Sequence, residues 1–110
     1  MKQNVITVAE VASVTGGTAS GEVGAVVLDI THDSRRAKQG FLFTAVRGEL
    51  FDAHKFIPQV MAAGALGVIS ELPAPADFQG AWLQVENVRR AMALAADFDK
   101  ALRREVGAFR

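Results

Sequence analysis

Polar side chains that could do chemistry gather between two apolar segments of the chain. Asp33, Ser34 and Arg35 follow directly on an alternating segment, and an apolar run begins at Phe41. The Ser34 hydroxyl both donates and accepts hydrogen bonds, and the Arg35 guanidinium suits a phosphate group. Taken alone, Asp-Ser-Arg is typical of a solvated turn. The alternative hypothesis is a polar ligand site at the end of a strand, with Arg35 available for phosphate.

A second candidate segment runs from Gly48 to Asp52, between the apolar run and a helical pattern. One interpretation is a simple strand-to-helix connection, in which Gly48 turns, Phe51 packs and Asp52 caps the helix. In the other, backbone amides near the helix start face the carbonyl or phosphate groups of a ligand, and Phe51 stacks on a base. The residues alone leave both interpretations open.

The sequence lacks the motifs of a self-sufficient catalytic centre. No Gly-Lys pair occurs, so there is no phosphate-binding P-loop, and no G-x-G-x-x-G fingerprint follows a strand. There is no cysteine, and the two histidines, His32 and His54, lack metal-ligand spacing. We therefore predict no catalytic residue, no cofactor-binding residue and no metal site. His32 is expected on the same side of the strand end as Ser34, and His54 as a polar residue of a helix's first turn.

Composition narrows the class of protein further. The 110 residues carry no formal net charge, which argues against partners such as nucleic acid or a membrane surface. The longest apolar run, residues 60–69, is too short to span a bilayer, and the amino terminus lacks the apolar core of a signal peptide. We expect a cytoplasmic location.

Helices and strands that position the polar residues can be predicted from spacing. Thr7 and Glu10 have the spacing of a capping box, which predicts a short helix that ends at Gly16. Residues 26–31 alternate with a period of two, which predicts one strand with a buried face. Further strands are expected over residues 41–46, 67–70 and 82–85. Helices are expected after the caps Asp52 and Asn87. The helix after Asp52 should start at about Lys55 or later, because Pro58 belongs in its first turn. Helix and strand alternate from Phe41 onward. We therefore predict a single small α/β domain, three-layer-like, with a mixed, partly parallel sheet flanked by helices.

The stretch DSRRAKQGFLFTAVRGELFDAHKFIPQVMAAGALGVISE resembles the amino-terminal domain of the Mur ligases that add the third residue or the terminal dipeptide to the peptidoglycan precursor. Their pattern is roughly D-S-R, then P-G-D-L-F-x-A-x-x-G, D-G-H-x-F-I-x-x-A and G-A. The matching residues are Asp33-Ser34-Arg35, Gly40, Leu42-Phe43, Ala45, Gly48, Asp52, His54, Phe56-Ile57 and Gly64-Ala65. The segment 85–98 is similar to the third-residue, MurE-type ligases. Gln39, Phe41 and Ala53 depart from the pattern, and Ala53 would require a different backbone if the usual Gly there has a positive φ.

The resemblance implies a function for the polar segments. In the MurE type the amino-terminal domain binds the uridine diphosphate end of UDP-N-acetylmuramoyl-L-alanyl-D-glutamate. By position, the substrate-binding residues would be His32, Ser34, Glu49, Leu50 and Phe51. ATP and magnesium would bind in a central domain, and the incoming amino acid in a third domain. These would be partners of residues 1–110, which alone are expected to be inactive. The same role in a dipeptide-adding, MurF-type ligase, and a non-catalytic interaction module with this fold, remain as alternatives.

Overall fold

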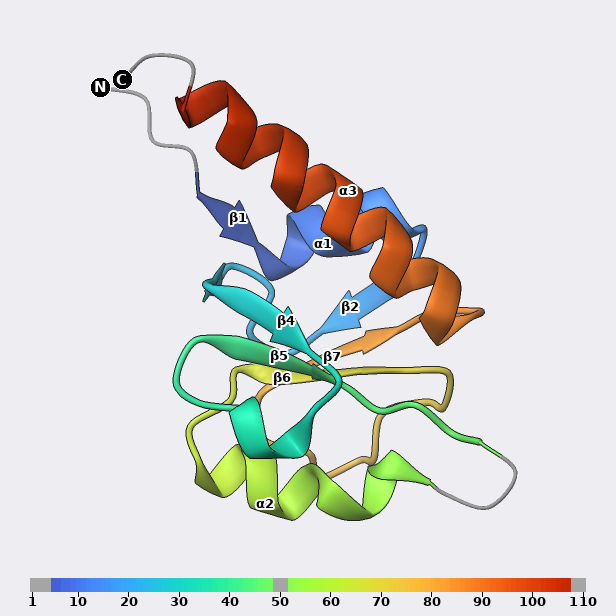
Figure 1. Ribbon diagram of the computed structural model, residues 1–110. Helices are drawn as coiled ribbons and strands as arrows, with labels where there is room; N and C mark the ends of the chain where they lie inside the picture. Colours follow the sequence, from blue (N-terminus) through green and yellow to red (C-terminus); the bar gives the residue numbers. More distant parts are fainter. Residues whose placement is uncertain (1–4, 49–51, 108–110) are drawn as a thin grey trace.

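The computed structural model describes residues 5–48 and 52–107. A sheet forms the middle layer, with α1 and α3 on one face and α2 on the other (Figure 1). The elements follow in the order β1 Ile6–Thr7, α1 Val8–Thr15, β2 Thr18–Ser20, β3 Val26–Val27, β4 Asp29–Thr31, η1 Ser34–Arg36, β5 Phe41–Thr44, η2 Ala53–Phe56, α2 Ile57–Ala62, β6 Gly67–Ser70, β7 Ala81–Gln84 and α3 Val88–Gly107, where η marks a 3₁₀ helix. The predicted three-layer α/β architecture is confirmed.

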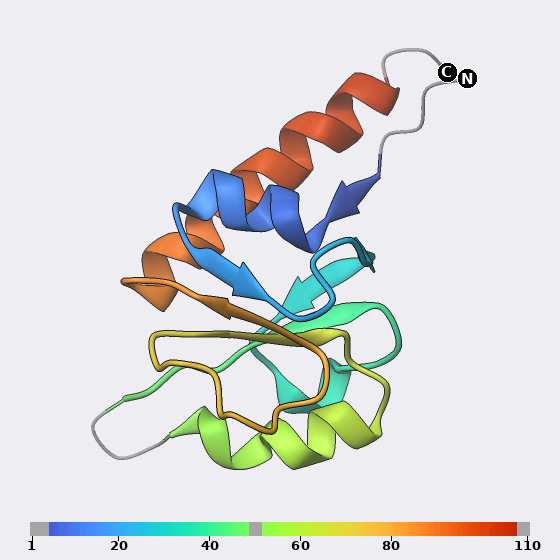
Figure 2. The ribbon, with the colours of Figure 1, turned by 180° about the vertical axis from the view of Figure 1, so that it is seen from behind.

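The main sheet is mixed, as predicted. Its five strands lie in the order β2-β7-β6-β5-β4, with β4 to β7 parallel and β2 antiparallel to β7. Figure 2 shows the same sheet from behind, with β2 beside β7. Because the four parallel strands point the same way, the segments that follow them emerge at one edge. That edge is where the Asp-Ser-Arg turn lies.

Two hydrophobic cores cover the two faces of the sheet. Alternation along β5 and β6 sends Leu42 and Ile69 to the α1 and α3 side, and Phe43 and Val68 to the α2 side. All four side chains are fully buried. Strands that are buried on both faces read as continuous apolar runs, which is why β5 and β6 were predictable.

Helix boundaries follow from local capping chemistry. Thr7 accepts a hydrogen bond from the Glu10 N–H, and the Glu10 carboxylate accepts one from the Thr7 N–H, so the predicted capping box is confirmed. The first helix ends at Gly16, whose φ of 72° is left-handed. Pro58 lies in the first turn of α2, which begins at Ile57, within the predicted range.

The helix α3 has the predicted cap and one that the sequence pattern did not reveal. The Asn87 side chain accepts from the Arg90 N–H at 3.0 Å. In addition, the Glu71 carboxylate accepts from the Val88 N–H at 2.9 Å. The second contact joins the segment after β6 to the start of α3, and a carboxylate there also favours the helix dipole.

One sequence prediction was wrong in detail: residues 26–31 are not a single strand. Val26 and Val27 pair with β1 in a separate two-stranded sheet, whereas Asp29 to Thr31 form the edge strand β4 of the main sheet. At the break, the Leu28 N–H donates to the Gly40 carbonyl at 2.8 Å, and the Leu28 side chain is 57% exposed. The chain changes sheets at Leu28, so alternation across the break does not mark one buried face. The strands β1 and β2 are too short to show a period.

Candidate functional site

A cleft of about 590 Å³ opens between η1 and the η2–α2 segment, at the carboxyl end of β4. Its lining consists of His32, Asp33, Ser34, Arg35, Ala53, Phe56 and Gln59. The volume is in the range of small-molecule sites, and the position matches the usual ligand edge of an α/β sheet.

The Asp33 side chain organises the first wall of the cleft. Its Oδ1 accepts from the Arg35 N–H at 3.0 Å, which starts the 3₁₀ turn η1. The same carboxylate accepts from Arg35 Nε and Nη2, both at 3.0 Å. These bonds from Arg35 lower the pKa of Asp33 from 3.8 to about 2. The expectation that Arg35 is available for phosphate is therefore met only in part, because Nε and Nη2 are engaged and Nη1 remains.

His32 and Ser34, two of the five predicted substrate-binding residues, both line this cleft. Ser34 is half-buried and His32 is exposed. Within residues 5–48 and 52–97, the Ser34 hydroxyl has no hydrogen-bond partner. A hydroxyl at the wall of a polar cleft is thus left to interact with whatever enters.

The other three predicted residues, Glu49, Leu50 and Phe51, lie outside the described residues. The chain on either side of them is joined: Arg47 and Asp52 form an antiparallel bridge, and the Ala53 N–H donates to the Val46 carbonyl at 2.9 Å. Ala53 itself is buried in η2, and no residue other than glycine has a positive φ in the described ranges. The departure from the family's glycine therefore needs no left-handed backbone here.

Sequence reasoning missed a cluster beside the cleft, which we call the histidine clamp: Asp52, His54 and Ser70. Asp52 Oδ1 accepts from the His54 N–H at 2.9 Å and lies 2.5 Å from His54 Nδ1. His54 Nε2 lies 2.6 Å from Ser70 Oγ. The hydrogen bonds from His54, the backbone one first, lower the pKa of Asp52. The available signals were the Asp-x-His spacing at a cap and a serine that ends an apolar strand, but the sequence does not place the two together.

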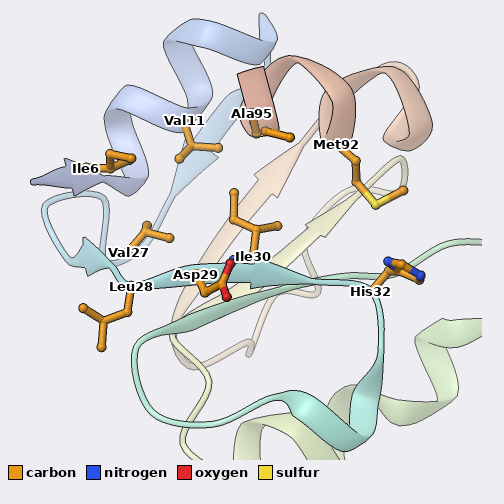
Figure 3. A pocket seen from close by; sticks show the side chains of 10 residues that line it. Ile6, Val11, Val27, Leu28, Asp29, Ile30, His32, Met92 and Ala95 are labelled. Carbon is orange, nitrogen blue, oxygen red and sulfur yellow. The ribbon is translucent and has the colours of Figure 1, made fainter. Parts of the chain in front are cut away.

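A second hollow, of about 360 Å³, lies on the other face of β4 and is mainly apolar. Figure 3 shows Val11, Ile30, Met92 and Ala95 around it, and places His32 at the end of β4 below Met92. His32 lines both hollows, which makes it the boundary between an apolar site and a polar one.

Among the side chains of residues 5–48 and 52–97, no three His, Cys, Asp or Glu form a group able to hold a metal ion. No helix in this part of the chain is long and apolar enough to cross a bilayer.

No protein-family model matches the chain, but individual proteins do. It is 46% identical over 70 residues to the UDP-N-acetylmuramoyl-L-alanyl-D-glutamate–2,6-diaminopimelate ligase of Solibacter usitatus, a match that covers 64% of this chain and 14% of the relative. A match of 49% identity over 45 residues, 41% of this chain and 10% of the relative, is to the UDP-N-acetylmuramoyl-tripeptide–D-alanyl-D-alanine ligase of a Synechocystis strain.

Among solved structures, a crystal structure of MurF from Acinetobacter baumannii superposes with a TM-score of 0.75 and 34% identity, covering 94% of this chain and 22% of the other. The chain spans only about 14–16% of the length of the first curated relatives. The resemblance stated from the motifs is confirmed: the chain is a homologue of the Mur ligases, of MurE and MurF types alike, and corresponds to their amino-terminal region.

Proposed function

We propose that this chain is the substrate-anchoring domain of an ATP-dependent Mur ligase, and that the cleft holds the uridine diphosphate end of UDP-N-acetylmuramoyl-L-alanyl-D-glutamate. The observation that carries the proposal is the Ser34 hydroxyl, which has no partner in the described parts of the chain and lines the cleft beside His32. A uracil ring and a diphosphate both offer hydrogen-bond acceptors, which suit a hydroxyl and an imidazole.

The residues of the cleft walls suit a nucleotide in polarity. Arg35 Nη1 lies on the first wall, held in place by the Asp33 carboxylate, and can meet a phosphate oxygen. Phe56 lies on the opposite wall, with Lys55 Nζ 5.3 Å from its ring centroid. An aromatic side chain at a cleft wall is a surface on which a base can stack. Glu49, Leu50 and Phe51 complete the proposed substrate-binding set.

Anchoring of this kind assists chemistry elsewhere in the ligase. Binding energy from a remote, unreactive part of a substrate serves to position its reacting carboxylate. We assign ATP, magnesium and the incoming amino acid to parts of a longer cytoplasmic ligase outside residues 1–110. The carboxylate is activated there as an acyl phosphate, which the amino group attacks, and these residues alone have no ligase activity.

The same anchoring role in a MurF-type ligase is the second candidate. It is favoured by the superposition on MurF over 94% of this chain, whereas the longer sequence matches to the diaminopimelate-adding relatives favour the MurE type. The two candidates differ in the peptide of the substrate, not in its nucleotide. A comparison of the dipeptide with the tripeptide form of the substrate, using the complete ligase, separates them.

The proposal is tested by titrating the 110-residue chain with UDP-N-acetylmuramoyl-L-alanyl-D-glutamate and following backbone amide signals by NMR. We expect saturable shifts at Ser34 and at neighbouring cleft residues. Uridine diphosphate alone should reproduce most of them. Absence of shifts at Ser34 up to millimolar ligand would overturn the proposal and leave an interaction module that has kept the fold without its ligand.

A further inference from the structure

The histidine clamp has the residue types and the order of a hydrolase triad, but its burial excludes that chemistry. The Ser70 side chain is fully buried, and its Oγ already accepts from the Leu72 N–H at 2.9 Å. A serine nucleophile needs room for a carbonyl carbon beside its Oγ. The three residues must therefore serve another purpose.

Partners at each atom fix the protons of the clamp. The Asp52 carboxylate only accepts, so His54 Nδ1 carries the proton of that contact. Ser70 Oγ accepts from Leu72 and directs its own proton to His54 Nε2. Both ring nitrogens of His54 then have a partner, and the imidazole is held from both sides. Two such contacts fix both the orientation and the tautomer of the ring. In the same way, the hydrogen-bond partner of the other ring nitrogen orients a histidine that binds a metal.

The clamp joins the far wall of the cleft to the sheet. His54 belongs to η2, whose Ala53 and Phe56 line the cleft. Ser70 is the last residue of β6, on the side of β5 away from β4. Backbone contacts of residues 46–47 with 52–53, and the packing of Ala53 and Phe56 in the core on the α2 side, also link η2 to the strands. The clamp adds a polar contact between a side chain of η2 and the end of β6.

We propose that His54 is a positioning residue for the nucleotide cleft: held between Asp52 and Ser70, it fixes η2 at the distance from η1 that the ligand requires. This rests on the proposed function of the cleft. His54 touches no ligand, since its ring points to β6 and its side chain is only 15% exposed. It acts through Ala53 and Phe56, its neighbours in η2.

The test measures the affinity of the 110-residue chain for uridine diphosphate in three variants. Asp52→Ala removes the oxygen that accepts from the His54 backbone N–H and from His54 Nδ1. Asp52→Asn keeps an oxygen at that place. Asp29→Ala is the matched control, because the Asp29 carboxylate also accepts from a nearby backbone N–H, that of Ile30, but at the opposite end of β4. We expect Asp52→Ala to weaken binding about tenfold, while Asp52→Asn and Asp29→Ala stay within about twofold of the parent.

If the clamp only stabilised the fold, Asp52→Ala would lower the free energy of unfolding without weakening nucleotide binding selectively. Unfolding by urea is therefore measured on each variant. Ring ¹⁵N shifts of His54 supply a ligand-independent readout, and should show a protonated Nδ1 in the parent chain. If Asp52→Ala does not fold, Ser70→Ala replaces it, since it removes the contact on the other side of the ring. If the parent chain binds uridine diphosphate and Asp52→Ala binds it with the same affinity, the positioning role alone is overturned. The same holds for Ser70→Ala where it replaces Asp52→Ala. No binding by the parent would overturn the cleft's function and this inference together.

Discussion

Ser70 Oγ lies 2.6 Å from His54 Nε2, and this contact joins the buried end of β6 to the 3₁₀ turn that walls the cleft. The pair is separated by 16 residues in the chain, with α2 between them. The strand β6 lies in the core, where local opening costs the most free energy, and it holds the 3₁₀ turn η2 in place. The candidate site is built on rigid parts even where its lining comes from turns.

Removal of the Ser34 hydroxyl should weaken nucleotide binding. We expect Ser34→Ala to cost about 1 kcal/mol of binding free energy, or roughly fivefold in Kd for uridine diphosphate, because one hydrogen bond to the ligand is lost. Titration calorimetry or NMR line shapes measure the change. Ser13→Ala is the matched control, since Ser13 is exposed on α1 across the sheet. Equal affinity in the Ser34 and Ser13 variants would remove Ser34 from the site.

The ion pair on the near wall predicts a pH effect. The pKa of Asp33, at about 2, is below its ordinary value of 3.8, chiefly because of its side-chain contact with Arg35. A lowered carboxyl pKa adds stability that is fully present above pH 3.8 and is lost as pH falls through about 2. In an NMR titration of the Asp33 carboxyl carbon, Arg35→Gln should bring the midpoint back toward 3.8. A midpoint near 4 in the parent chain would contradict the paired geometry.

The capping box of α1 should be measurable as stability. Thr7→Ala removes the oxygen that accepts the Glu10 N–H, and we expect it to lower the free energy of unfolding by about 1 kcal/mol. Thr7→Ser keeps the oxygen and should lose less than half of that. Chemical denaturation of the three proteins decides the point. An alanine variant as stable as the serine variant would show that the cap is not formed in solution.

Close approach of two strands should make Gly67 sensitive to substitution. A Cβ at Gly67 would lie 1.9 Å from the Ala81 carbonyl oxygen, and strand backbone has little room to move away. We expect Gly67→Ala to destabilise the fold by about 3 kcal/mol, which urea unfolding would report. At Gly24 a Cβ would meet nothing within 4 Å, so Gly24→Ala should leave stability nearly unchanged. Similar stability of both variants would contradict the β6–β7 register.

Local chemistry explains why much of the fold could be predicted from the sequence. The Thr7 cap, the position of Pro58 and the apolar run that starts at Phe41 each have a short-range physical cause, and each prediction is confirmed. The break at Leu28 could not be predicted, because a pattern of alternation does not record which sheet a strand joins. The short strand β2 is held by pairing with β7, which no local signal contains.

The candidate site also has features that the sequence predicted and features that it did not. His32 and Ser34 are two residues apart and follow one strand, so their presence on one cleft could be expected. The histidine clamp could not, because Ser70 meets His54 only through the stacking of β5 beside β6. One of the two hypotheses from the sequence left Arg35 available for phosphate, but the Asp33 carboxylate two residues earlier accepts hydrogen bonds from two of its nitrogens.

The most direct test of the cleft assignment is to locate the nucleotide by intermolecular NOEs. The base protons H5 and H6 of uridine diphosphate are observed with the isotope-labelled 110-residue chain at saturating ligand. Contacts to Ser34 and Phe56 are the result that a ligand in the polar cleft requires. Contacts to Ile30 and Met92 would place the base in the apolar hollow on the other face of β4 and contradict the assignment.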